Sequence, residues 1–175
     1  LGIFDDDFND YIHDLNSFKN LREINLHVSV NHSNRFPKEI GNLSALKSLV
    51  LNQSSIKKLP DEIGNLTSLN TLELQESNIV EISSQIKNLL RLEKIELRDT
   101  KNLETLPKEI GNLISLKDLS LKNSAIKNLP DEIGNLESLE NIDLSDTLLK
   151  SLPKGFGKIS NSKNLNLYNK KNLDT

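Results

Sequence analysis

Apolar side chains recur along this chain at fixed intervals. One complete unit has them at Leu46, Leu49, Leu51, Ile56, Leu59, Ile63 and Leu66. Units begin at Leu21, Leu46, Leu69, Leu92, Leu116 and Leu139, with Ser162 in the seventh slot. Four of the steps between them are 23 residues, the first is 25, and the step from Leu92 is 24. A repeat of this length predicts a solenoid, in which each coil buries its apolar face against its neighbours.

The start of each unit predicts a short β-strand. Between Leu46 and Leu51 the apolar residues Leu49 and Leu51 alternate with polar or exposed positions, as a strand with one buried face requires. Because every strand starts at the same point of its coil, the strands should stack in parallel. Seven such strands at about 4.8 Å spacing give a sheet on the order of 30 Å long. The insertions, near Val28–Arg35 and Lys101–Asn102, should bulge outward because the leucines stay in phase.

A hydroxyl residue follows each strand where the chain turns inward. These residues are Ser54, Ser77, Thr100, Ser124 and Thr147. Backbone amides lose their sheet partners at this turn, and a side chain that both donates and accepts satisfies buried polar groups. We therefore expect this turn ladder to bridge one coil to the next.

The second half of the unit predicts short helical or 3₁₀ turns on the outside. Pro60, Pro107, Pro130 and Pro153 suit the first turn of a helix, and acids such as Asp61 suit its positive end. Gly-Asn pairs at 41–42, 64–65, 111–112 and 134–135 should end the turns with a left-handed residue. Outer turns are bulkier than inner strands, so the stack should curve with its strands on the concave face. Looser turns are expected where Ile82-Ser83 replaces Leu-Pro and Lys87 replaces glycine, and at 154–159.

The two ends depart from the repeat. Residues 1–20 place Phe8, Tyr11, Ile12, Leu15 and Phe18 on one helical face, which predicts an N-terminal capping helix. The alternative is a decayed repeat. Residues 21–175 then hold about six full repeats and a partial seventh, and we expect either that the native protein continues beyond it or that its C-terminal end is exposed. The chain does not begin with methionine, so we expect a fragment or a processed product.

Composition narrows the possible functions. A net charge of -3 gives no long-range attraction to nucleic acid or anionic membranes, and no apolar run is long enough to span a bilayer. Without cysteine there is neither a disulfide framework nor thiolate chemistry. His27 and His32 lack a placed carboxylate and are read as surface residues rather than metal ligands. We therefore predict no catalytic residues, no metal site and no cofactor.

The repeated phrase, including Leu59-Pro60-Asp61-Glu62-Ile63-Gly64, resembles leucine-rich repeat proteins of the 23-residue class over about residues 21–173. Such proteins include bacterial secreted or surface proteins, intracellular Ras-pathway proteins and plant immune receptors. The resemblance implies an α/β solenoid, a curved horseshoe that binds macromolecules, generally proteins, with its concave parallel sheet. This chain departs from the usual pattern in having Ser or Thr in place of Asn at the turn ladder.

Only the outward-facing strand positions are free to carry a site. The candidate partner-binding residues are Val50, Glu73, Gln75, Glu96, Arg98, Ser120, Lys122 and Asp143. The alternative is a solvated sheet face with internal ion pairs, such as Glu96 with Lys117 or Lys122. We predict a protein-interaction module that is monomeric, binds no nucleic acid, does not insert into membranes and belongs to a bacterial secreted or surface protein. The alternative is a cytoplasmic sensor or scaffold region of a larger signalling or immune-receptor protein.

Overall fold

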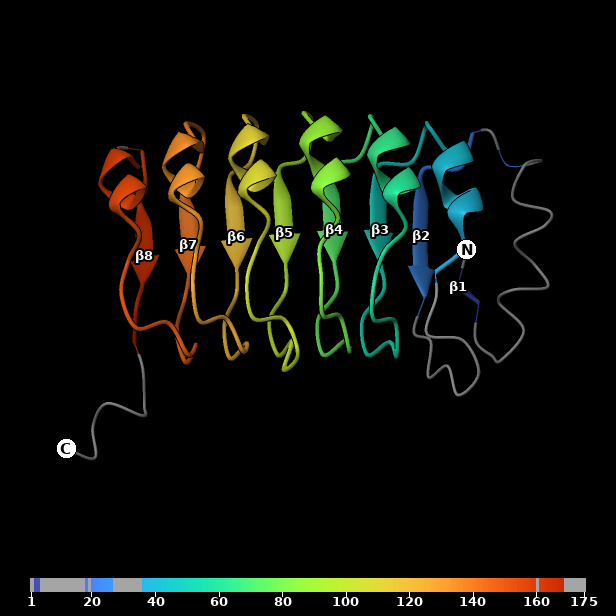
Figure 1. The fold of residues 1–175 in the computed structure, drawn as a ribbon. Coiled ribbons are helices and arrows are strands. Elements are labelled where there is room, and N and C mark those ends of the chain that lie inside the picture. Colours follow the sequence, from blue (N-terminus) through green and yellow to red (C-terminus); the bar gives the residue numbers. More distant parts are fainter. Residues whose placement is uncertain (1, 4–17, 19, 27–35, 160, 169–175) are drawn as a thin grey trace.

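The computed structural model describes residues 2–3, 18, 20–26, 36–159 and 161–168. It is a single stack of coils whose strands form a parallel eight-stranded sheet in sequence order (Figure 1). The strands are β1 (Gly2–Ile3), β2 (Glu23–Leu26), β3 (Ser48–Val50), β4 (Thr71–Glu73), β5 (Lys94–Glu96), β6 (Asp118–Ser120), β7 (Asn141–Asp143) and β8 (Asn164–Asn166). The register aligns equivalent positions, so that Leu72 lies opposite Leu49 on one side and Ile95 on the other.

Each of the six coils that begin between Leu21 and Leu139 carries a five-residue 3₁₀ turn on the face away from the sheet (Figure 1). These turns are η2 (Lys38–Asn42), η3 (Asp61–Asn65), η4 (Ser84–Asn88), η5 (Lys108–Asn112), η6 (Asp131–Asn135) and η7 (Lys154–Lys158). The sheet is curved and unclosed, with the strands on its concave face, and the described residues form no long helix. The sequence prediction of fold class is therefore confirmed.

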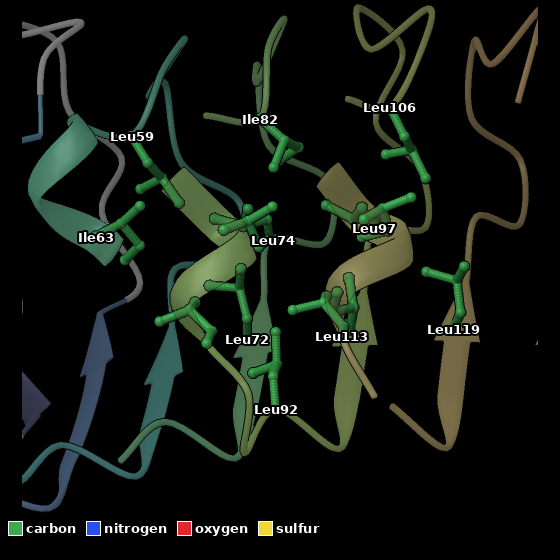
Figure 2. Packing of buried hydrophobic residues seen from close by; sticks show 14 of the residues in the cluster. Leu59, Ile63, Leu72, Leu74, Ile82, Leu92, Leu97, Leu106, Leu113 and Leu119 are labelled. Atoms are coloured by element: carbon green, nitrogen blue, oxygen red, sulfur yellow. The ribbon is translucent and has the colours of Figure 1, made fainter. Parts of the chain in front are cut away.

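The core is a continuous column of leucine and isoleucine between the sheet and the outer turns. Leu46, Leu49 and Leu51 are fully buried in the second coil, and equivalent residues are buried in the following coils. Figure 2 shows Leu74 and Leu97 inside the stack, with Leu113 reaching the same core from the end of an outer turn. The insertion at Lys101–Asn102 does bulge outward, because both residues are exposed while Leu103 beyond them is buried.

The expectation of a looser outer turn in the coil that begins at Leu69 is wrong. Its 3₁₀ turn, η4, has the same length as the others, although Ser83 stands where they have proline. The Ser83 hydroxyl oxygen accepts a hydrogen bond from the Gln85 amide at 3.1 Å and the hydroxyl donates to Asp61 Oδ1 of the preceding coil at 2.6 Å. A side-chain cap thus replaces the fixed backbone of proline. At 154–159 the turn also forms, as η7.

The glycines of the outer turns do not serve as left-handed residues, as the sequence had suggested. No glycine among the described residues has a positive φ. Instead, these glycines lie against the next coil, and a Cβ at Gly111 would fall 2.3 Å from the Glu132 carbonyl oxygen. They are required for close approach of the coils rather than for a left-handed end of the turn.

The left-handed positions lie on the other side of the coil, one residue before the turn ladder. They are Gln53, Glu76, Asp99, Asn123 and Asp146, with φ between 54° and 61°. None of them is β-branched, which agrees with the steric cost of that region for branched side chains.

Replacing Glu76 with valine is expected to lower the free energy of unfolding by about 1–3 kcal/mol, because a β-branched residue is strained at positive φ. Glu76→Gly should avoid that strain. The control is Asn78→Val, at an exposed position of the same loop whose φ is not positive. Urea unfolding followed by circular dichroism measures all three. An equal loss for the two valine variants would contradict the proposed strain.

The turn ladder does not bridge coils through its hydroxyls, which corrects the sequence expectation. Ser77, Thr100 and Thr147 each donate to a carbonyl three residues earlier in their own coil, at 2.7–2.9 Å. The hydroxyls of Ser54 and Ser124 are buried without a hydrogen-bond partner. Backbone groups join the coils here, for example the Asn78 amide to the Ser54 carbonyl at 2.9 Å. Where the ladder hydroxyl is bonded, at Ser77, Thr100 and Thr147, it therefore closes its own turn.

The ends of the stack differ from its middle. The predicted capping helix lies mostly outside the described residues, but Gly2 and Ile3 form a strand beside β2 that the sequence did not predict. Phe18, which the sequence placed on the apolar face of the capping helix, is exposed. At the other end, Leu165 and Leu167 are about half exposed, as expected, whereas Leu173 lies outside the described residues.

Candidate functional site: the concave sheet face

Parallel register arranges the predicted site residues in columns across the concave face. The last residue of each strand forms one column, in which Val50, Glu73, Glu96, Ser120, Asp143 and Asn166 lie opposite one another in turn. A second column lies two residues after the first in each coil and consists of Asn52, Gln75, Arg98, Lys122, Ser145 and Tyr168. The structure therefore brings the eight candidate residues onto one continuous surface.

In the centre of this surface, the polar candidates bond to one another. Arg98 donates to Gln75 Oε1 from Nε at 2.8 Å and from Nη2 at 2.7 Å. Gln75 Nε2 in turn donates to Glu73 Oε2 at 3.4 Å, and Lys94 Nζ lies 2.7 Å from Glu73 Oε1. These contacts link β4 to β5 and satisfy most of the hydrogen-bonding capacity of Glu73 and Gln75.

Glu96 is the least satisfied member of this group. Its nearest cation is Arg98, whose Nε lies 3.9 Å from Glu96 Oε1, too far for a hydrogen bond. That oxygen is buried and has no hydrogen-bond partner. The sequence had suggested Lys117 or Lys122 as partners for Glu96, and this is wrong, because Lys117 lies 2.8 Å from Glu93 Oε2 instead.

Further along the sheet, the candidates Ser120, Lys122 and Asp143 are less engaged. Asp143 Oδ1 accepts hydrogen bonds from the Ser145 amide at 2.9 Å and the Ser145 hydroxyl at 2.5 Å, so its partners are neutral. Lys122 is exposed, and its ammonium makes no hydrogen bond or ion pair within the described part of the chain. Ser145, at the position of the next coil that is equivalent to Lys122, is buried.

This less engaged region is hollowed. A depression of about 780 Å³ lies over β5–β8, and its rim and floor include Glu96, Asp118, Lys122 and Asp143. A second depression of about 490 Å³ adjoins it at the carboxyl ends of the strands and shares Lys122. The predicted site residues of β3 and β4 line neither depression.

The sequence-based list of candidate residues left out the first residue of each strand, which in β5–β8 also lines the large depression. There Asn141 Nδ2 donates to Asp118 Oδ1, and Asn164 Nδ2 donates to Asn141 Oδ1 at 2.6 Å. The sequence could have predicted this, because the first and last residues of each strand both flank a buried residue and therefore face the same side of the sheet.

A row of exposed charges borders the face where the strands begin. Lys117 pairs with Glu93 and Lys163 with Glu140, both at 2.8 Å. The hydrogen bond and charge of Glu93 raise the pKa of Lys117, and those of Lys163 lower the pKa of Glu140. Because the pKa of Glu140 is lowered in the folded chain, its contribution to stability is present near neutral pH and is lost as the pH falls through that lowered pKa. Both groups lie at the surface in contact with solvent, so these pairs organise the surface more than they stabilise the fold.

The described residues contain no group of three or more His, Cys, Asp or Glu side chains placed to hold a metal ion. In the same residues, no helix has the length and apolar content needed to cross a membrane. The histidines considered in the sequence, His27 and His32, lie outside the described part.

Comparison with known proteins now gives the family. A family model for a leucine-rich repeat region matches residues 1–121 and 100–174. The chain belongs to the leucine-rich repeat family. A comparison with curated proteins gave no match. The subclass with 23-residue repeats remains a prediction.

Solved structures of other leucine-rich repeat proteins share the fold. A leucine-rich repeat protein of Leptospira interrogans is 36% identical with a TM-score of 0.80, and the alignment covers 89% of this chain and 39% of that one. The plant peptide hormone receptor RGFR1, in complex with RGF2, is 31% identical with a TM-score of 0.64, over 86% of this chain and 29% of the receptor. TLR13, in complex with the RNA ssRNA13, is 25% identical with a TM-score of 0.77, and the alignment covers 89% of this chain and 23% of TLR13. The chain thus spans less than two fifths of the length of each of these proteins.

Proposed function

We propose that this leucine-rich repeat chain is a protein-interaction module that binds its partner through the concave sheet face. The observation that carries the proposal is the aligned, polar, hollowed surface built by equivalent positions of successive strands. RGFR1, which is similar in fold, is seen in complex with RGF2, and this supports a peptide or protein partner. TLR13 is seen with RNA, but the net charge of -3 here disfavours a polyanion. The proposal assigns the chain no catalytic role and no cofactor.

We further propose that the chain acts as a monomer within a bacterial secreted or surface protein. The 36% identity to the Leptospira interrogans protein over 89% of this chain supports the bacterial part of this proposal. A second candidate is the sensor or scaffold region of a larger signalling or immune-receptor protein, which the similarity to a plant receptor favours. The complete reading frame distinguishes them. A signal peptide without a signalling domain supports the first, and an adjoining kinase, ATPase or GTPase-like domain supports the second.

A pull-down with a concave-face variant tests the binding proposal. Replacing Glu73, Glu96 and Arg98 together with alanine removes two carboxylates and one cation from the centre of the face. Partners recovered with the unaltered chain should be reduced at least tenfold, because these charges set electrostatic complementarity. The matched control replaces Glu62, Glu132 and Lys108 of the convex turns with alanine, which makes the same change in charge, and should recover the partners normally. Equal recovery of every partner by both variants would exclude the concave face.

A further inference from the structure

The large depression over β5–β8 has an excess of acidic charge once its ion pairs are considered. Its lining includes the cations Lys94, Arg98, Lys122 and Lys163 and the carboxylates Glu96, Asp118 and Asp143. Lys94 and Lys163 are held by Glu73 and Glu140, which lie outside the lining, at 2.7 and 2.8 Å. Arg98 and Glu96 balance each other at 3.9 Å. Asp118 and Asp143 remain, against the single ammonium of Lys122.

The hydrogen-bond partners of the two remaining carboxylates are neutral groups. Asp118 accepts from the side-chain amide of Asn141, and Asp143 accepts from the amide and hydroxyl of Ser145. Beside them, the buried Glu96 Oε1 has no hydrogen-bond partner. An incoming cation would pair with Asp118 and Asp143, whereas an incoming anion would add repulsion.

We propose that this depression binds a basic, extended polypeptide segment with lysine or arginine at alternate positions. The inference rests on the proposed function of the concave face and specifies the chemistry of its partner. Asp118 lies opposite Asn141, and Asp143 is two residues further along the same strand. Diagonal positions of this kind are about 7–8 Å apart in a sheet. Side chains two residues apart in an extended segment are about 6.6 Å apart, which is close enough for each to reach one carboxylate.

Lys122 is the specificity-determining residue of this surface. Its exposed ammonium lines both depressions and lies in the column next to that of Asp143. It repels a basic segment and attracts an acidic one, so its removal has opposite effects on the two kinds of partner. The only polar contact of Lys122 within the described residues is through its backbone carbonyl, which accepts from the Asp99 amide at 2.9 Å, so replacing the side chain by glutamine should leave the fold intact.

Titration with a decapeptide of alternating lysine and serine tests the proposal. The dissociation constant is measured calorimetrically at 0.15 M salt, and amide chemical shifts of the ¹⁵N-labelled chain locate the site. Asp118→Asn together with Asp143→Asn should weaken binding at least fivefold, while Lys122→Gln should strengthen it about twofold, in line with one removed like charge at a screened surface. The asparagines still accept the bonds from Asn141 and Ser145.

The convex control, Glu62→Gln with Glu132→Gln, removes the same charge and should leave the dissociation constant within twofold of that of the unaltered chain. Shifts should fall on Ser120 and Asp143 and spare Val50.

Other outcomes overturn the inference and separate it from the proposed function. Preferential binding of a glutamate–serine decapeptide, weakened by Lys122→Gln, refutes the basic partner but leaves the concave protein site standing. Chemical-shift changes confined to β3 and β4 would likewise refute binding in the depression but leave the concave protein site standing. Binding of an RNA decamer in preference to both peptides refutes the inference and the proposed function together. Absence of binding of the lysine peptide at millimolar concentration refutes the inference alone, since the pull-down tests the function independently.

Discussion

Replacing Leu97 with alanine is expected to lower the free energy of unfolding by about 2–5 kcal/mol. Leu97 lies in a central coil and is 1% exposed; the equivalent residues of the neighbouring coils, Leu74 (Figure 2) and Leu121, are also buried. Its truncation removes apolar contacts and leaves a cavity that the neighbouring coils cannot fill without losing their own register. Urea unfolding followed by circular dichroism gives the loss.

The control is Leu167→Ala, the same position of the repeat in the last described coil. Leu167 is 45% exposed, so its truncation removes less buried surface and should cost less than about 1 kcal/mol. Similar losses at the two positions would mean that the last coil is packed as tightly as the middle ones. In a solenoid each coil contacts only its neighbours, so position along the stack should govern the effect.

The second large effect is expected for Gly134→Ala, which should lower the free energy of unfolding by about 1–3 kcal/mol through overpacking. A Cβ at Gly134 would lie 2.0 Å from the carbonyl oxygen of Gly155 in the next outer turn. The obstacle is backbone, which cannot rotate away as a side chain can. The outer turns η6 and η7 would therefore have to separate.

Gly157→Ala is the matched control, because a Cβ there meets nothing within 4 Å. Both substitutions restrict the unfolded chain in the same way, so the difference between them isolates the contact between the coils. Thermal unfolding should show a lower midpoint for Gly134→Ala and an unchanged or slightly higher one for Gly157→Ala. An equal response would mean that the outer turns separate without cost.

Much of the fold was predictable, because the repeated phrase constrains each coil in the same way. The strands, the outer turns, the bulge at Lys101–Asn102 and the aligned exposed column all follow from apolar residues that keep their phase. The errors arose where one residue type has several physical uses. Glycine was assigned a left-handed role, but at Gly111 and Gly134 it permits close approach instead. Ser83 was read as weakening a turn, but it caps the turn.

The candidate site was predictable in place but not in detail. Glu73, Gln75, Glu96 and Arg98 do lie on the concave face, yet their side chains mostly contact one another. Lys117 bonds to Glu93 rather than Glu96, although the two glutamates are three residues apart in one strand segment. Such choices depend on the reach and direction of side chains across two coils, which periodicity does not specify.

By itself the sequence determined the solenoid, the buried set and the columns of exposed positions, because burial of leucine at a fixed period admits one stacking. Only the tertiary structure decided which exposed groups remain available. Ion pairs between residues 21 to 24 positions apart engage Lys94, Lys117 and Lys163, whereas the hydrogen-bond partners of Asp118 and Asp143 are neutral. The physical reason is that the unpaired charge in one region of the surface depends on which side chains contact one another. These contacts form only when the coils are stacked.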